Sequence, residues 1–313
     1  MEFSVVFQSI LIITIMIFIG VVLSKTFPFN EDTRKLFISL IVNVAMPCII
    51  LSSIFKVEIN KDTFKLMVLV FCLSIVINSI GIALGWSITK VFYKDSNKKR
   101  ELAILSGLGN TGFIGIPLCA TLIGPEGALF AAIFDAGVDF VIWTVGALIL
   151  QKNSRFDLKT LKSMINVPTI AIVLGLGTAY FNIKPPILMI ELTSQLAALA
   201  TPIAMIYIGV LIMTLKASKV RESGSQIWVP LSVKLIILPL TVLLLIHVYA
   251  FNPVINQTIL VQSMMPTLTL ASILFSKYSA DEGMGAITTI LSTIISLSTI
   301  PLMLYVVNMF FVF

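Results

Sequence analysis

Two stretches of this chain place hydrogen-bonding side chains beside helix-breaking residues, inside segments that are otherwise apolar. The first is GNTGFIGIP, residues 109–117, in which Asn110 and Thr111 stand among three glycines and Pro117. Glycine costs about 1 kcal/mol and proline about 3 kcal/mol in a helix interior. Proline also lacks the N–H that would bond the carbonyl of Phe113. The pattern therefore predicts a broken helix with an amide and a hydroxyl at the break.

The second stretch is TILVQSMMPTLTLAS, residues 258–272, where Pro266 follows Gln262 and Ser263. An unsatisfied backbone group costs several kcal/mol in lipid, so a break at membrane depth must lie in protein or beside a watery cavity. Half-helix N-termini carry partial positive charge and free N–H groups, which suit a carboxylate. A lone proline usually marks a packed kink. Two breaks at corresponding places, each with polar side chains, favour a binding site.

Three ionisable residues stand inside other apolar segments. Asp135 and Asp139 in FDAGVDF are four residues apart and share one helix face, and Lys234 begins the run KLIILP. Such residues are functional candidates within a membrane. We expect Lys234 to pair with Asp139, which leaves Asp135 to bind a proton near neutral pH. The alternatives are a structural hydrogen bond for each acid, and a Lys234 side chain that extends to the membrane interface.

The composition indicates that membrane helices must position these residues. The 313 residues are 58% hydrophobic and 12% charged, with a mean hydropathy of +1.06, whereas a soluble domain is about 25% charged. A transmembrane helix needs about 20 apolar residues. This length predicts ten spans, at 4–24, 34–54, 65–90, 100–123, 126–150, 165–182, 187–215, 227–250, 256–276 and 284–312.

Lysine and arginine gather in alternate loops between these segments, with 16 in the odd-numbered loops and 4 in the even-numbered ones. By the positive-inside rule the odd loops are cytoplasmic, so we expect both termini outside. The net charge of +6 lies in these short loops, so we expect no nucleic-acid partner. The three cysteines have no spacing typical of a metal site, and we expect neither a metal nor a cofactor.

The ten segments divide into two sets of five. We expect residues 1–150 to form a first five-helix repeat, 151–163 a basic cytoplasmic linker, and 164–313 a second repeat. An odd number of spans in each repeat inverts the second relative to the first, as in many secondary transporters. Short matches at nearly one offset support the repeat: Ala-Met-Pro at 45–47 with Ala-Thr-Pro at 200–202, and Glu-Gly at 126–127 with Glu-Gly at 282–283.

At these residues the chain resembles the auxin efflux carriers, a family that includes plant PIN-FORMED auxin exporters and bacterial carriers of malonate, malate and related acids. The resemblance rests on GNTGFIGIPL from residue 109, with Pro47, KLIILP and Pro266 in support. It implies an all-α, bile-acid-symporter-like or sodium/proton-antiporter-like fold in which broken spans 4 and 9 cross. Spans 1, 2, 6 and 7 would form a scaffold, and spans 3 to 5 and 8 to 10 a transport domain. The long cytoplasmic loop of the plant exporters is absent, which favours a bacterial carrier.

The resemblance also implies roles for residues at the breaks. Asn110 would hydrogen-bond the substrate anion, and Pro117 and Pro266 would hold the crossing open. Gln262 matches no family residue and is included for its position alone. The candidate substrate-binding residues are thus Asn110, Thr111, Gly112, Pro117, Gln262 and Pro266, and the candidate coupling residues are Asp135, Asp139 and Lys234.

These expectations describe a secondary transporter in the inner cell membrane, with a small organic anion and the lipid bilayer as partners. The anion would be an auxin-like carboxylate or a dicarboxylate, carried by an elevator-type mechanism with proton coupling. The family allows a homodimer through the scaffold helices. Two other classes stay open. A sensor would bind without turnover, whereas an intramembrane enzyme would need a nucleophile with its base, or a metal triad, which the single histidine and isolated cysteines do not supply.

Overall fold

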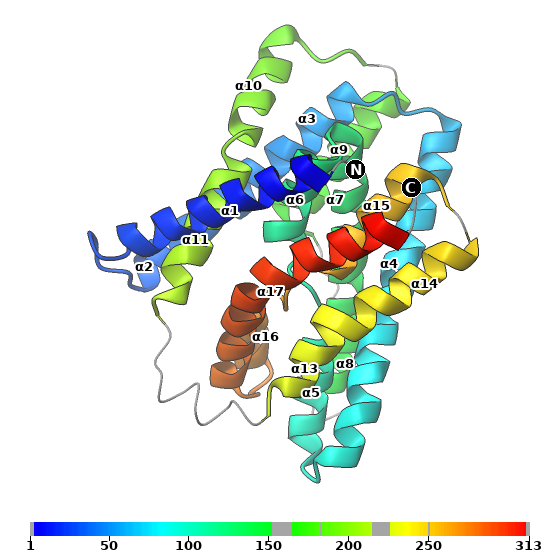
Figure 1. Cartoon of the computed structure of the whole chain (residues 1–313). Coiled ribbons are helices and arrows are strands. Elements are labelled where there is room, and N and C mark those ends of the chain that lie inside the picture. Colours follow the sequence, from blue (N-terminus) through cyan, green and yellow to red (C-terminus); the bar gives the residue numbers. More distant parts are fainter. Residues whose placement is uncertain (1–2, 152–164, 182, 215–225, 250, 311–313) are drawn as a thin grey trace.

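The structure is a computed structural model that describes residues 3–151, 165–181, 183–214, 226–249 and 251–310 (Figure 1). Every regular element within these ranges is a helix or a helical turn. The expected linker at 151–163 lies outside the described residues except for Gln151.

The helices of the first expected repeat follow its five predicted apolar segments. Asn30 and Asn60 begin two of them, because each side chain accepts a hydrogen bond from the N–H three residues further on. In chain order the elements are α1 (Phe3–Leu23), α2 (Glu31–Leu40), η1 (Ile41–Ala45), α3 (Met46–Lys56), α4 (Lys61–Phe92), α5 (Ser96–Gly107), η2 (Thr111–Gly115), α6 (Ile116–Leu122), α7 (Pro125–Val141), η3 (Ile142–Gly146) and α8 (Ala147–Leu150), where η denotes a π-helical turn.

The second expected repeat also follows its predicted apolar segments. Asn166 and Asn252 begin helices in the same way, through side chains that accept backbone N–H groups. The elements are α9 (Val167–Tyr180), α10 (Ile187–Ala197), α11 (Ala200–Ile212), α13 (Trp228–Ser232), η5 (Val233–Ile237), α14 (Leu238–Tyr249), α15 (Pro253–Ser263), α16 (Ala271–Lys277) and α17 (Glu282–Phe310).

Within the described ranges, six helical stretches are long and apolar enough to cross a membrane: Asp32–Lys56, Lys61–Phe92, Pro125–Leu150, Ile187–Ile212, Trp228–Tyr249 and Glu282–Val307. Three shorter apolar helices, Leu11–Leu23, Thr111–Leu122 and Val167–Tyr180, accompany them. The chain is therefore a multi-pass membrane protein. The count of ten spans and the inverted repeat stay predictions.

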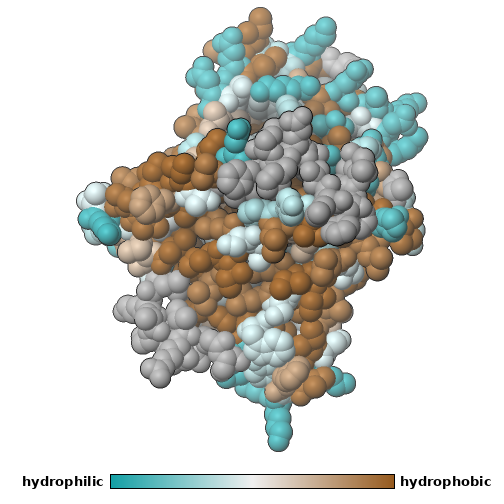
Figure 2. Space-filling view, viewed as in Figure 1, coloured by the Kyte–Doolittle hydropathy of each residue, from teal (hydrophilic) through white to brown (hydrophobic). Residues whose placement is uncertain are grey.

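The surface carries the apolar region that a membrane protein needs. Figure 2 shows hydrophobic residues across the middle of the molecule and hydrophilic residues gathered toward its upper and lower ends. Large apolar side chains such as Val173 on α9, Leu188 on α10 and Leu244 on α14 are exposed. A continuous apolar surface of this kind marks contact with lipid rather than with water.

Helices α1 and α11 pack along each other with their backbones in close contact (Figure 1). A Cβ atom at Gly20 would lie 2.2 Å from the carbonyl oxygen of Ile206, and one at Gly209 would lie 2.0 Å from that of Ile17. Small residues permit this approach, which is a common way for membrane helices to associate. On the other side of the molecule α4 packs against α5 and α7, and α15 packs against α7.

Three of the π-helical turns lie just before a proline. η1 precedes Pro47, η2 precedes Pro117 and η5 precedes Pro239. Proline has no N–H to give to the carbonyl four residues back, so the turn before it loses that bond. In η2 the wider turn forms instead, since the N–H of Ile116 bonds the carbonyl of Thr111.

Candidate functional site

The two broken helices satisfy each other's backbone. The break between α5 and η2 lies beside the break between α15 and α16, and residues 108–110 and 266–268 form a short antiparallel bridge. We call these two segments the paired breaks. The hydrogen bonds run from the Asn110 N–H to the Pro266 carbonyl (2.7 Å) and from the Leu268 N–H to the Leu108 carbonyl (3.2 Å). Backbone that has left a helix thus keeps its partners without contact with lipid.

Hydroxyl groups fix the second break from two sides. The Thr267 N–H donates to the Ser292 hydroxyl at 3.0 Å, and the Thr267 hydroxyl donates to the Leu105 carbonyl at 3.2 Å. The Thr289 hydroxyl donates to the Leu268 carbonyl at 2.8 Å. Ser292 and Thr289 lie on α17, so this helix holds the break in place. This role could not be predicted from the sequence, because serine and threonine occur throughout α17.

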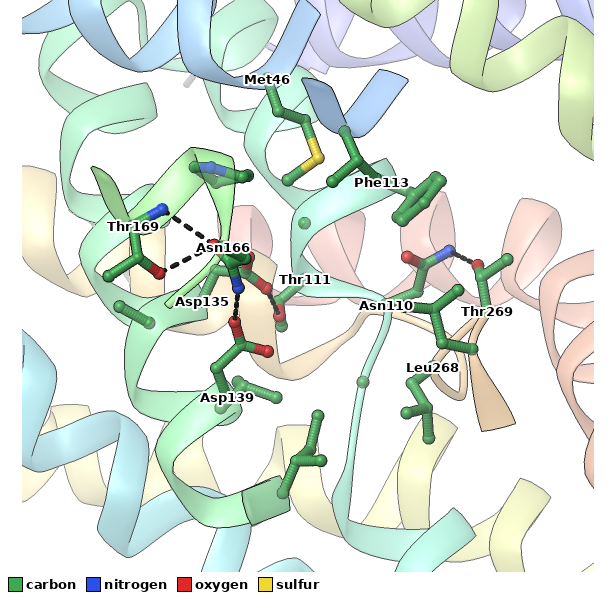
Figure 3. A pocket seen from close by; sticks show the side chains of 18 of the residues that line it. Met46, Asn110, Thr111, Phe113, Asp135, Asp139, Asn166, Thr169, Leu268 and Thr269 are labelled. Carbon is green, nitrogen blue, oxygen red and sulfur yellow. Dashed lines mark hydrogen bonds between the residues drawn. The ribbon is translucent and has the colours of Figure 1, made fainter. Parts of the chain in front are cut away.

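A cavity of about 200 Å³ opens at the paired breaks. Its walls come from η1 and α3, from η2, from α7 and η3, from α9, and from α16 (Figure 3). Five of the nine predicted site residues line it: Asn110, Thr111, Gly112, Asp135 and Asp139. The polar groups thus come together from distant parts of the sequence inside an otherwise apolar wall.

Asn110 and Thr269 form the polar contact at the inner end of this cavity. The Asn110 side chain is 3% exposed, and its Nδ2 donates to the Thr269 hydroxyl (Figure 3). An amide group has two N–H donors, so the bond to Thr269 leaves one for a ligand. Thr269 was not among the predicted residues, although it stands three residues after Pro266 and just before α16.

The two acids lie one helical turn apart on α7 and have different partners. The Thr111 hydroxyl donates to Asp135, and the Asn166 amide donates to Asp139 at 2.8 Å (Figure 3). A Cβ atom at Gly112 would lie 2.9 Å from Asp135 Oδ2, so only glycine lets this carboxylate come so close to η2. Asp139 thus has the structural hydrogen bond that was the alternative expectation for the acids.

Lys234 does not form the expected ion pair with Asp139. In the part of the chain that the structure describes, no ion pair or hydrogen bond joins the Lys234 ammonium to another residue. The side chain is 1% exposed, so it does not extend to the membrane interface. A Cβ atom at Gly109 would lie 2.9 Å from both Cε and Nζ of Lys234. Lys234 therefore packs against the first paired break, while Asp139 faces the cavity.

The remaining predicted residues support the cavity from outside its lining. Pro117 lies in the first turn of α6, and Pro266 contributes its carbonyl to the paired breaks. Gln262 is fully buried on α15, where its Nε2 donates to the Ala131 carbonyl at 3.4 Å. Its Oε1 would lie 2.1 Å from a Cβ atom at Gly115. Gln262 therefore contacts the back of η2 rather than the cavity.

The lining also contains functional groups that the sequence analysis missed. Asn166 is the N-cap of α9, and its Oδ1 accepts from the N–H and the hydroxyl of Thr169 while its amide reaches Asp139. Trp143 and Lys277 also line the cavity. Within the described residues, no three His, Cys, Asp or Glu side chains gather as a metal site would require. The site therefore offers amides, hydroxyls, two carboxylates and one ammonium group.

An apolar all-helical fold around a polar cavity at helix breaks is the arrangement of a membrane transport protein. The profile of the membrane transport protein family matches residues 5–304, and the chain belongs to this family, the auxin efflux carriers.

Three relatives are transporters by name. The chain is 24% identical to an uncharacterized transporter of Methanothermobacter thermautotrophicus, over 94% of this chain and 96% of that one. It is 26% identical to an uncharacterized transporter of Methanocaldococcus jannaschii, over 94% of this chain and 96% of that one. It is 23% identical to a putative malonate transporter of Rhizobium meliloti, over 64% of each chain. These names are consistent with transport rather than with catalysis.

Proposed function

We propose that the protein is a secondary transporter of a small organic carboxylate, which binds in the cavity at the paired breaks. The observation that carries this proposal is the buried Asn110 amide at the uncapped start of η2. Among the residues that the structure describes, no side chain caps η2 at Asn110. The first N–H groups of η2 are therefore available to an anion, together with the second donor of Asn110. The relative named as a malonate transporter supports a carboxylate substrate.

The two acids in the lining argue for proton coupling. A carboxylate substrate beside ionised Asp135 and Asp139 would be repelled, because like charges interact strongly away from water. A proton taken up by Asp135 removes part of that repulsion. The Thr111 hydroxyl links Asp135 to the first residue of η2, where the anion would bind. The proton and the anion would thus bind next to each other and cross together.

The movement that follows is proposed from the family resemblance and the packing. Helices α4 to α8 and α13 to α17 would carry the cavity, and α1 to α3 with α9 to α11 would form the scaffold. The backbone contact between Gly20 on α1 and Ile206 on α11 gives that scaffold a rigid element. The helices that carry the cavity would slide past the scaffold and expose the cavity to each side of the membrane in turn. The chain would form a ten-span inverted repeat with both termini outside. The membrane would be the inner cell membrane, and a dimer would form through the scaffold.

Reconstitution into proteoliposomes tests the transport function. Wild-type protein should take up radiolabelled malonate or a monocarboxylate such as phenylacetate with saturation. Asn110→Ala should abolish binding and uptake while the protein keeps its fold, since the amide is expected to serve the ligand. Asn97→Ala is the matched control, because Asn97 is exposed in the first turn of α5. Binding with unchanged affinity in Asn110→Ala would contradict the assignment of the site.

The same experiment separates the other two classes. A sensor would bind a carboxylate, detected as a thermal shift, without moving it into the vesicles. An intramembrane enzyme would convert the acid, so the recovered label would no longer be the acid supplied.

A further inference from the structure

A lysine that the proposed transport does not use lies against the first break. Lys234 is 1% exposed, and its Cε and Nζ would each lie 2.9 Å from a Cβ atom at Gly109. In the described part of the chain, its ammonium group forms no hydrogen bond or ion pair. Gly109 itself lines the cavity. A buried ammonium group without a counter-charge is therefore in contact with the cavity wall.

Two glycines of the first break each leave room for an ionisable side chain. Gly109 leaves room for Lys234, and Gly112 leaves room for Asp135, whose Oδ2 would lie 2.9 Å from a Cβ atom there. Neither glycine has a positive φ, so neither backbone conformation is one that only glycine adopts readily. The missing side chains at these two positions therefore serve the close approach of Lys234 and Asp135 to the break.

Stabilisation of the break itself is the structural alternative for Lys234. A cation is favourable near a helix C-terminus, and α5 ends at Gly107. However, the carbonyl groups of Leu105 and Leu108 accept hydrogen bonds from the second break. Lys234 donates to neither of them, so its ammonium group still lacks an acceptor. A buried cation in this state is costly unless something else compensates its charge.

An anion bound at Asn110 would supply that counter-charge. Asn110 directly follows Gly109, and adjacent Cα atoms are about 3.8 Å apart. The bound anion would therefore lie on the order of 10 Å from the ammonium group, a distance at which unit charges still attract each other inside a protein. Lys234 is not among the described lining residues. The attraction would thus act across the backbone of Gly109 and not through a direct contact.

We propose that Lys234 is the charge-compensating residue of the substrate site, whose ammonium group stabilises the bound carboxylate from behind the first break. Asn110 and the start of η2 bind the carboxylate oxygens, and Lys234 makes the site selective for negative charge. A dicarboxylate gains more than a monocarboxylate, because the attraction scales with the charge. This inference rests on the proposed carboxylate transport and adds to it the residue that selects the substrate by charge.

Equilibrium binding of two acids that differ in charge tests the lysine. With purified protein in detergent, Lys234→Met should raise the Kd of radiolabelled phenylacetate about tenfold, the loss expected for a unit charge roughly 10 Å away at an effective dielectric constant of about 20. The Kd of malonate should rise by a larger factor. Lys90→Met is the matched control, because Lys90 is exposed in the last turn of α4; both Kd values should stay within about twofold of the wild type.

Gly109→Ala tests the approach of the ammonium group without removing it. The added Cβ atom would displace the flexible end of the Lys234 side chain, so the Kd of both acids should rise. Lys234→Leu has a side chain too short to reach Gly109. In that background Gly109→Ala should have no further effect, whereas additive losses would show that Gly109 acts independently of the lysine and would contradict the proposal.

The melting temperature of the ligand-free protein separates charge compensation from the structural alternative. Lys234→Met should melt no lower than the wild type, yet lose most of the stabilisation that malonate gives. A lower melting temperature with equal losses of affinity for the two acids would assign Lys234 to the structure of the break and overturn the proposal.

The outcomes also distinguish this proposal from the transport function. Wild-type protein that neither binds nor takes up either acid contradicts both together. Wild-type uptake with unchanged Kd values in Lys234→Met contradicts the charge-compensating role alone.

Discussion

Gly209 offers a direct test of the close packing between α1 and α11. In Gly209→Ala the new Cβ atom would lie 2.0 Å from the Ile17 carbonyl oxygen. A carbon–oxygen contact normally needs about 3.3 Å, so the two backbones must separate by about 1.3 Å. The atom in the way belongs to a helix backbone, which cannot rotate aside as a side chain can. Overpacking of this kind costs about 1–3 kcal/mol.

Gly177→Ala is the matched control for this substitution. Gly177 also lies within a helix, α9, but an added Cβ atom there would meet nothing within 4 Å. It should be neutral or stabilise the helix by roughly 0.5–1 kcal/mol, the ordinary difference between glycine and alanine.

Thermal unfolding of the purified protein in detergent measures the difference. Gly209→Ala should lower the melting temperature by about 2–6 °C, on a scale of roughly 2 °C per kcal/mol for a chain of this size. Tyr207 lies on α11, two residues before Gly209. Its ring centroid is 6.4 Å from that of Phe113, which lines the cavity. Because displacement of α11 would move this contact, carboxylate affinity should fall as well. Equal melting temperatures for Gly209→Ala and Gly177→Ala would refute the steric reasoning.

The remaining predictions concern charge. Asp135→Asn should abolish the pH dependence of uptake and retain anion exchange, because no proton can bind at that position; an unaltered pH profile means that the coupling proton binds elsewhere. Lys234→Met should raise the melting temperature, since an unpaired buried charge is replaced by an apolar chain of similar length; a lower melting temperature would indicate that the ammonium stabilises the paired breaks. An alkaline phosphatase fused to the C-terminus should be active and one fused after Lys94 inactive, and the reverse pattern would contradict the proposed orientation.

The helices and the breaks were predictable because their signals are local. Hydropathy alone located the ten apolar segments, each of which is helical in the described residues. Glycines and Pro117 predicted the first break, and Pro266 with Gln262 predicted the second. That these two segments cross was implied by the family resemblance. No local pattern indicates which distant backbone carbonyl accepts the hydrogen bond of the Asn110 N–H.

The partners of the charged side chains were not predictable, because depth in the membrane does not fix the direction in which a helix faces. Lys234 and Asp139 were expected to pair, yet Lys234 packs against Gly109 and Asp139 accepts a hydrogen bond from Asn166. Trp143 and Lys277 were not singled out from the sequence. Only the arrangement of η3 and α16 shows that they share a cavity with the acids.

The pairing of the two breaks also constrains how the chain is made. Asn110 and Thr269 are 159 residues apart, and at 5–20 residues per second the ribosome needs roughly 10 to 30 seconds to make that stretch. During this time the Asn110 N–H and the Leu108 carbonyl lack the partners that the second break provides. A peptide group without a hydrogen-bond partner costs several kcal/mol in lipid. The first break must therefore stay in contact with water or the insertion machinery until the second break is made. In the first 150 residues, synthesised alone, these two backbone groups would stay without their partners from the second break.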